Sequence, residues 1–172
     1  ILLKDESKRF GLNAFKMLGG AYAVARMLCD KYDLDINDFD FEKLKKEIAG
    51  KMTFTSTTDG NHGRALAAAA QSLGCRCVIV LHAEVSTERE AAIAAYGADI
   101  VRVAGDYDES VREAERLARE NGWDVVSDTS YAGYEEVPRD VMQGYGIIAD
   151  ELLQDVASDA ACPWTHVFLQ GG

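Results

Sequence analysis

Three polar side chains are candidates for chemistry: Lys16, Asp59 and Asp128. Lys16 is the only charged residue in the stretch 10–22, which otherwise holds apolar residues, glycines and Asn13. If Asn13 caps a helix, the Lys16 amine lies near the positive end of that helix among apolar groups, and both effects disfavour the ammonium form. An amine that loses its proton readily can form a Schiff base with a carbonyl compound. The alternative is a surface lysine whose stem covers apolar neighbours.

The two aspartates follow apparent strands. Asp59 lies in the polar, glycine-containing turn 57–63, and Asp128 comes directly after the strand pattern at 124–127. The carboxyl ends of parallel strands share one edge, where ligands bind and helix N-termini favour anions. Two carboxylates there, with a lysine nearby, are suited to acid and base chemistry. A single aspartate after a strand is usually a turn former or helix cap, and it is the pair of them near a lysine that favours chemistry. His62 is interpreted as a structural histidine.

The elements that would hold these residues follow from periodicity. Apolar spacing predicts a helix over 14–31 and a shorter one over 41–48. Beyond them strands alternate with helices, the strands at 52–56, 75–81, 99–103 and 124–127 and the helices at 64–73, 87–96, 106–120 and 138–154. This alternation predicts right-handed β-α-β units, and therefore a three-layer α/β/α fold with a parallel sheet.

Local signals refine this picture. Gly19 and Gly20 weaken the first helix, so we expect them to permit close approach of another backbone. Thr87 with Glu90, and Asp106 with its acidic partner three residues later, predict capping boxes at two helix starts.

The composition limits the kinds of partner and site that we expect for this protein. The chain has 172 residues, a net charge of −11 and a pI of about 4.7, which argue against nucleic acid or an anionic membrane as a partner. No apolar run is long enough to span a membrane. The four cysteines form no C-x-x-C pair and the three histidines are scattered, so we expect no metal site, reduced thiols and a cytoplasmic location.

Taken together, several motifs resemble the fold type II pyridoxal-phosphate enzymes, the tryptophan-synthase β-like family. The motifs are RFGLNAFKMLGG at 9–20, TTDGNHGR at 57–64, DT at 128–129, GY at 133–134, VP at 137–138, MQGY at 142–145 and THVFLQ at 165–170. Within this family the chain is similar to the diaminopropionate ammonia-lyase branch. Serine and threonine dehydratases of this fold usually have serine where this chain has Asp59.

The resemblance implies pyridoxal 5'-phosphate as cofactor. Lys16 would hold it through a Schiff base, and Asn61 would hydrogen-bond its phenolic oxygen beside Gly60. Gly171 and Gly172 would begin the glycine-rich phosphate loop.

The implied reaction is α,β-elimination of ammonia from 2,3-diaminopropionate of either chirality, which gives pyruvate and ammonia. Asp59 and Asp128 would contact the amino groups of the substrate or move protons. Two alternatives stay open: a serine or threonine dehydratase of the same fold, and a non-catalytic small-domain module.

The resemblance also implies a division into domains. Residues 1–53 would belong to a large cofactor domain, 54–145 would form a small α/β domain, and 146–172 would return to the large domain. The chain starts without methionine and stops after the strand-like 167–170 and two glycines. We therefore expect an N-terminal fragment, inactive alone, of an enzyme that is a homodimer at full length.

Overall fold

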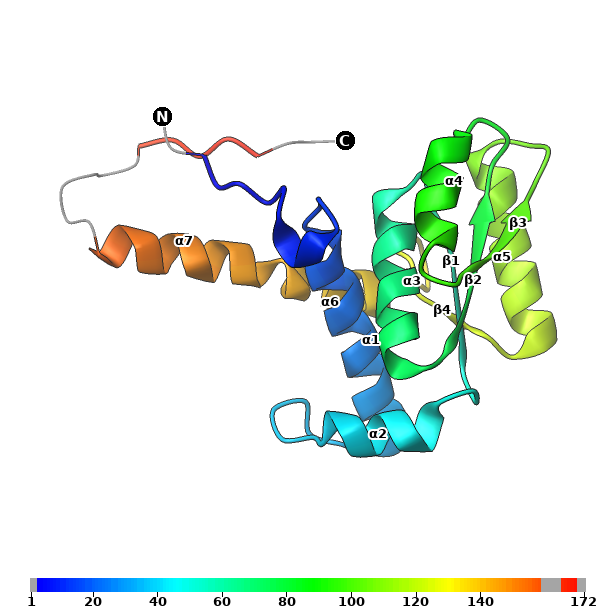
Figure 1. The fold of residues 1–172 in the computed structure, drawn as a ribbon, viewed down its shortest axis with the longest axis horizontal. Coiled ribbons are helices and arrows are strands. Elements are labelled where there is room, and N and C mark those ends of the chain that lie inside the picture. The colour runs from blue at the N-terminus through cyan, green and yellow to red at the C-terminus, as the bar shows by residue number, and fades with distance from the viewer. Residues whose placement is uncertain (1–2, 159–164, 170–172) are drawn as a thin grey trace.

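The computed structural model describes residues 3–158 and 165–169 of the chain (Figure 1). The helices are the short 3-10 helix η1 (Arg9–Gly11) and α1 (Lys16–Tyr32), α2 (Phe41–Ile48), α3 (Asn61–Leu73), α4 (Thr87–Ala94), α5 (Tyr107–Asn121), α6 (Glu136–Gly144) and α7 (Gly146–Ser158). The strands are β1 (Thr53–Thr57), β2 (Arg76–Leu81), β3 (Asp99–Arg102) and β4 (Asp124–Val125). None of the helices in the described ranges is long and apolar enough to cross a membrane.

The four strands form one parallel sheet in the order β3-β2-β1-β4. Helices α3 and α4 lie on one face of this sheet and α5 lies on the other, so the predicted three-layer α/β/α architecture is confirmed (Figure 1). The chain runs outward from β1 through β2 to β3 and then returns to place β4 beside β1. The carboxyl ends of β1 and β4 thus meet where the direction of winding reverses, which is the usual ligand-binding position of an open α/β sheet.

The core lies between the sheet and the helices on its α3 side. Phe54 of β1, Leu66 of α3 and Ile79 of β2 are fully buried there, together with Leu28 of α1. Burying one such side chain is worth about 1.5–3 kcal/mol, so this cluster ties α1 to the α/β layers.

Helix α1 crosses α6 at a point that only glycine allows. A Cβ on Gly19 would lie 2.6 Å from the carbonyl oxygen of Val141, and a Cβ on Gly144 would overlap the backbone of Leu18. The close approach predicted for Gly19 and Gly20 is therefore confirmed at Gly19 only, because a Cβ on Gly20 would lie an ordinary 3.6 Å from the Cβ of Ala65. Because α1 also packs on α3, the crossing fixes the start of α1, and Lys16 with it, relative to the sheet.

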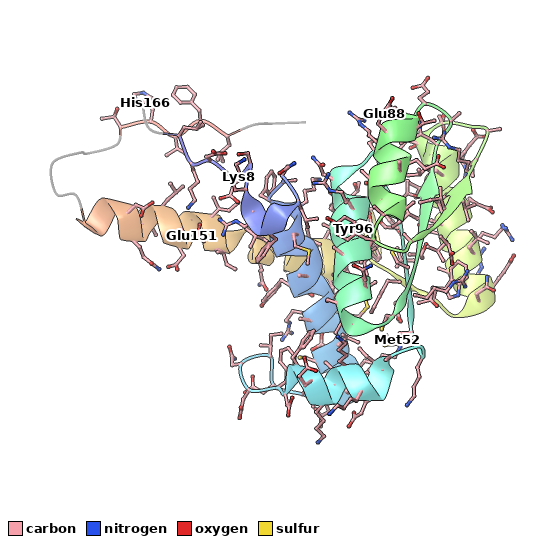
Figure 2. All side chains as sticks on the ribbon, in the orientation of Figure 1. Lys8, Met52, Glu88, Tyr96, Glu151 and His166 are labelled. Carbon is pink, nitrogen blue, oxygen red and sulfur yellow. The ribbon has the colours of Figure 1, made fainter. Side chains whose placement is uncertain are left out.

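The N-terminal segment is bound to α7 by ion pairs. Figure 2 shows Glu151 on α7 close to this segment. Arg9 Nη2 lies 2.6 Å from Glu151 Oε2, and Lys4 Nζ lies 2.6 Å from the same oxygen. The hydrogen bonds from Arg9, and secondarily from Lys4, lower the pKa of Glu151 to about 2.

The predicted capping residues of two helices, α1 and α4, are wrong. Asn13 does not cap α1: it has a φ of 54°, and α1 begins after Phe15 with no side-chain cap. The capping box expected at Thr87 is absent, because Ser86 is the N-cap and accepts the bond from Arg89 N at 3.4 Å. The capping box of Asp106 is confirmed at the start of α5.

Three other boundaries differ. The helix expected over 138–154 is two helices, since α6 ends at Gly144 and α7 begins at Gly146. Strand β4 ends at Val125, although Val126 N still donates to Thr55 O at 2.8 Å. Beyond this bond, the carbonyl oxygen of Val126 contacts Nε2 of His62, and the hydroxyl of Tyr134 donates to Val125 O and accepts from Ser127 N. Residues 165–169 form no strand and are exposed, with no described strand beside them to pair with. Gln170 lies outside the described residues.

Candidate active site

A pocket of about 680 Å³ opens at the carboxyl edge of the sheet, between the loops after β1 and β4 and the start of α1. Its lining residues are Lys16, Thr58, Asp59, Gly60, Asn61, His62, Arg89, Tyr107, Asp128 and Thr129. Thus every site residue predicted from the sequence lines this one pocket, except Gly171 and Gly172, which lie outside the described residues.

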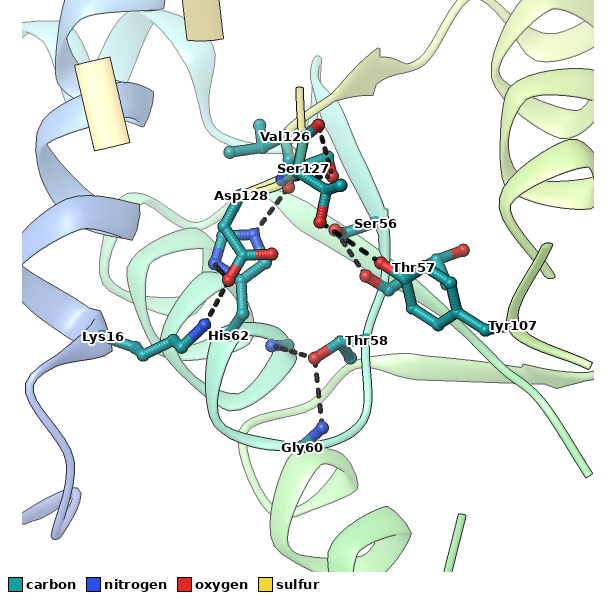
Figure 3. Close-up of polar contacts among 12 residues, drawn as sticks. Lys16, Ser56, Thr57, Thr58, Gly60, His62, Tyr107, Val126, Ser127 and Asp128 are labelled. Carbon is teal, nitrogen blue, oxygen red and sulfur yellow. Dashed lines mark hydrogen bonds and ion pairs between the residues drawn. The ribbon is translucent and has the colours of Figure 1, made fainter. Parts of the chain in front are cut away.

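Lys16 and Asp128 form an ion pair in this pocket, between Nζ and Oδ2 (Figure 3). The side chain of Lys16 is 32% exposed and that of Asp128 is 18% exposed, so water screens the pair only in part. Burial would raise the pKa of Asp128, but the neighbouring His62 and the hydrogen bond from Lys16 outweigh it, and the pKa is lowered. The sequence indicated only apolar neighbours for this amine, whereas the structure places a carboxylate beside it.

His62 lies behind Asp128 and is 2% exposed. Its Nε2 is 2.8 Å from the carbonyl oxygen of Val126, which is the structural role expected for it. The sequence did not indicate that Nδ1 of the same ring would face Asp128 Oδ2 at 3.9 Å. Burial, foremost, lowers the pKa of His62, so the ring favours the neutral form.

The turn after β1 is organised by Thr58. Its Oγ1 accepts hydrogen bonds from Gly60 N and Gly63 N, both at 3.1 Å. Gly60 has a φ of +154°, which side chains rarely tolerate, and a Cβ on Gly63 would overlap the methyl group of Thr58. The turn therefore needs these residue types, and it places Asn61 at the first position of α3, at the wall of the pocket.

The carboxylate of Asp59 contacts a different histidine from the one that faces Asp128. Its side chain is 64% exposed, and its Oδ1 lies 2.7 Å from Nε2 of His82. Arg89 Nη1 donates to the carbonyl oxygen of Asp59 at 3.2 Å. His82 and Arg89 were not predicted as site residues, although His82 directly follows β2 and its strand position could have indicated it.

Tyr145, at the junction of α6 and α7, packs edge-on against Phe15 with ring centroids 5.0 Å apart. Its hydroxyl is buried without a hydrogen-bond partner. Burial, followed by the charge of Asp128, raises the pKa of Tyr145. Within the described part of the chain no group of three or more His, Cys, Asp or Glu side chains could hold a metal ion.

Comparison with known proteins places this geometry in a family. Diaminopropionate ammonia-lyase of Escherichia coli is 52% identical over 172 residues, which cover 100% of this chain and 43% of the relative. The protein of the same name from Salmonella typhimurium is 43% identical over 176 residues, covering 100% of this chain and 44% of the relative. The crystal structure of the Escherichia coli protein in apo form aligns with a TM-score of 0.88 at 50% identity, over 93% of this chain and 43% of that chain.

The chain thus spans less than half the length of these relatives. The family described as "Pyridoxal-phosphate dependent enzyme" matches residues 1–172, the whole chain. Lys16, the turn at 57–63 and Asp128 meet in one pocket within that match, and the chain belongs to the family of pyridoxal-phosphate-dependent enzymes.

Proposed function

We propose that this chain is part of an ammonia-lyase that removes ammonia from 2,3-diaminopropionate by α,β-elimination, giving pyruvate and ammonia. The observation that carries the proposal is the pairing of the Lys16 amine with Asp128 in a pocket that also contains Asp59. The 52% identity to diaminopropionate ammonia-lyase supports the substrate.

The pocket fits pyridoxal 5'-phosphate. Its volume of about 680 Å³ is within the range of small-molecule sites, roughly 300–1,000 Å³. The Lys16 amine lies at the wall of the pocket. Gly60 exposes its backbone to the pocket because it has no side chain, and Asn61 is the first residue of α3. We propose that Lys16, Gly60 and Asn61 hold the cofactor, with Gly171 and Gly172 at its phosphate. When bound, the cofactor supplies an electron sink for the negative charge left when the Cα proton departs.

The two carboxylates would then have separate tasks. Asp128 touches Lys16 Nζ and can take or return a proton at that atom. Asp59 would bind the β-ammonium group of the substrate and keep it protonated, because neutral ammonia leaves far more readily than an amide anion. A carboxylate there also favours a cationic side chain over the neutral hydroxyl of serine. If one base lies on each side of the substrate's Cα atom, the Cα proton can be removed from either enantiomer.

The division of the chain also remains a proposal. We propose that residues 54–145 form the small domain and that 1–53 and 146–172 belong to the large domain, in a cytoplasmic homodimer that degrades amino acids. The net charge of −11 supports a small-molecule substrate over nucleic acid.

The test uses the full-length protein with added cofactor. Pyruvate and ammonia released from each enantiomer of diaminopropionate are compared with the products released from serine and threonine. We expect kcat/KM to be at least about tenfold higher for diaminopropionate, and Lys16→Ala to abolish the cofactor's protein-bound absorbance band. A preference for serine or threonine would instead support the dehydratase alternative. An intact protein that shows no bound-cofactor absorbance would support the non-catalytic module.

A further inference from the structure

We propose that His62 receives the proton that Lys16 must release to become a nucleophile, so that Lys16, Asp128 and His62 share one proton. His62 would be a positioning residue that acts through Asp128. This inference rests on the proposed function, in which Lys16 attacks a carbonyl carbon.

The hydrogen bonds define which nitrogen of His62 can accept that proton. A carbonyl oxygen only accepts, so the 2.8 Å contact with Val126 O requires Nε2 to carry the hydrogen. In the neutral ring Nδ1 then has a free lone pair. It points toward Asp128 Oδ2 at 3.9 Å, and Figure 3 shows the two groups side by side with Lys16 beyond them.

Nδ1 of His62 is buried and has no hydrogen-bond partner. It faces a carboxylate oxygen, which is also an acceptor, so no hydrogen lies between the two atoms. Buried polar atoms are rarely left without a partner, and such an exception calls for an explanation. A proton on Nδ1 would give that nitrogen a hydrogen to donate to Oδ2, once the two atoms move closer than 3.9 Å.

That proton is available from Lys16. An ammonium has no lone pair, so attack on a carbonyl carbon requires that one N–H bond at Nζ breaks first. The proton passes to Asp128 Oδ2, which touches Nζ, and from there to His62 Nδ1, where a new N–H bond forms. Asp128 is a carboxylate before and after the transfer. The trio therefore keeps a net charge of zero, and no unpaired charge is left in a poorly hydrated site.

The loss of the Lys16 proton changes the charges that act on His62. Burial and the positive charge of Lys16 lower the pKa of His62, whereas Asp128 and the bond to Val126 raise it. Once Lys16 is neutral, its charge no longer lowers the pKa of His62, and burial is the remaining effect that does. Tyr145, at the end of α6, and Tyr134, in the loop after β4, also respond to the charge of Asp128. Asp59 and Arg89 line the same pocket.

The first test needs no cofactor. The ring nitrogens of His62 are followed by NMR against pH in the full-length protein and in Lys16→Met, which keeps most of the side-chain length but lacks the charge. We expect the titration midpoint of His62 to lie at higher pH in Lys16→Met, and the addition of Asp128→Asn to reverse the shift. Lys31→Met is the matched control, because it removes the distant ion pair of Lys31 with Asp124 (3.2 Å) and should leave the midpoint unchanged. Equal midpoints in wild type and Lys16→Met would overturn the inference.

The second test adds pyridoxal phosphate to the wild-type protein. Attachment to Lys16 is trapped with borohydride and located by mass spectrometry, while NMR reports the protonation of His62. We expect attachment to produce the imidazolium signal. Attachment with His62 still neutral would defeat the inference but leave the proposed function intact. If the cofactor does not attach to Lys16 but the His62 midpoint still shifts in Lys16→Met, the proposed function is defeated. The coupling among Lys16, Asp128 and His62 would then still hold.

His62→Gln can still donate to Val126 but cannot hold the proton. We expect it to slow cofactor attachment at pH 7 by about tenfold or more, and the loss to shrink at higher pH, where hydroxide in the solvent can replace His62 as the proton acceptor. An unchanged attachment rate would count against His62, and the Lys16→Met titration decides the matter if this variant does not fold.

Discussion

Gly19 of α1 and Gly144 of α6 lie where the two helices cross, and neither position has room for a Cβ. The crossing is one turn beyond Lys16, the first residue of α1. It therefore sets how far the amine extends over the carboxyl edge of the sheet.

The first prediction is that Gly144→Ala destabilises the full-length protein by about 1–3 kcal/mol, the usual cost of overpacking. The added methyl group would overlap the backbone of Leu18, and α1 and α6 would have to separate. Unfolding by denaturant measures the loss. Gly146→Ala is the control, since a Cβ there has no neighbour within 4 Å. Similar effects from both variants would contradict the importance of the crossing.

The second prediction concerns Asp128→Asn, which removes the partner of Lys16. Proton transfer at Nζ would be lost, and we expect kcat/KM to fall by about 10²–10⁴-fold with the fold intact. Asp124→Asn removes a partly exposed carboxylate that pairs with Lys31 outside the pocket, and it should leave activity within about twofold. A small effect of Asp128→Asn on activity would remove Asp128 from the proposed machinery.

The same variant gives a third prediction, on pH. The pKa of Asp128 is lower in the folded than in the unfolded protein, so its stabilising effect is complete above the ordinary aspartate pKa of about 3.9. The effect is lost as the pH falls through the lower, folded value. Wild type should therefore exceed Asp128→Asn in unfolding free energy at pH 6, and this difference should narrow below about pH 4. A difference that stays constant down to pH 3 would mean that Asp128 does not titrate in this way.

The order of elements could be predicted because each buried strand leaves its own pattern. Residues 77–81 form an unbroken apolar run that is typical of a strand covered on both faces, and Gly74 ends the preceding helix in the left-handed conformation. The break at Tyr145 was not predicted, because the apolar spacing of residues 138–154 is helical across it. The glycines on both sides of Tyr145 were a local signal for the break, and the contact of Tyr145 with Phe15 is a tertiary feature that the sequence does not show.

The site was partly predictable for a similar reason. The rule that parallel strands share a carboxyl edge was enough to bring Asp59 and Asp128 to one pocket. It could not show that Asp128 faces His62 while Asp59 faces His82. Those contacts depend on strand order and on side-chain direction, which a single sequence does not contain.

The fourth prediction compares two helix caps. Asp106 makes a reciprocal capping box, with Glu109 N donating to Asp106 Oδ1 at 2.9 Å and Asp106 N donating to Glu109 Oε2 at 3.0 Å. Ser86 makes one long bond of 3.4 Å. Asp106→Ala should therefore cost about 1 kcal/mol or more of unfolding free energy, and Ser86→Ala less. If thermal unfolding ranks the two variants in the reverse order, the capping box is not what stabilises the start of α5.

The last prediction is that His82 maintains substrate preference through Asp59. Its Nδ1 accepts from Glu84 N at 3.3 Å, so Nε2 carries the hydrogen and donates to Asp59 Oδ1 at 2.7 Å. Asp59 is largely exposed, and without this bond its carboxylate would move freely in water. His82→Phe should lower kcat/KM for diaminopropionate about tenfold, since a hydrogen bond to a charged group is worth about 1.5–3 kcal/mol, and should change that for serine little.

His82→Gln retains an N–H donor and should recover most of the preference lost in His82→Phe. The comparison separates positioning from packing, because Phe and Gln both fill the space of the ring in part but only Gln can hold Asp59. Equal losses with both variants, or equal losses on diaminopropionate and serine, would mean that His82 supports the fold of the loop after β2 and has no part in recognising the substrate's second amine.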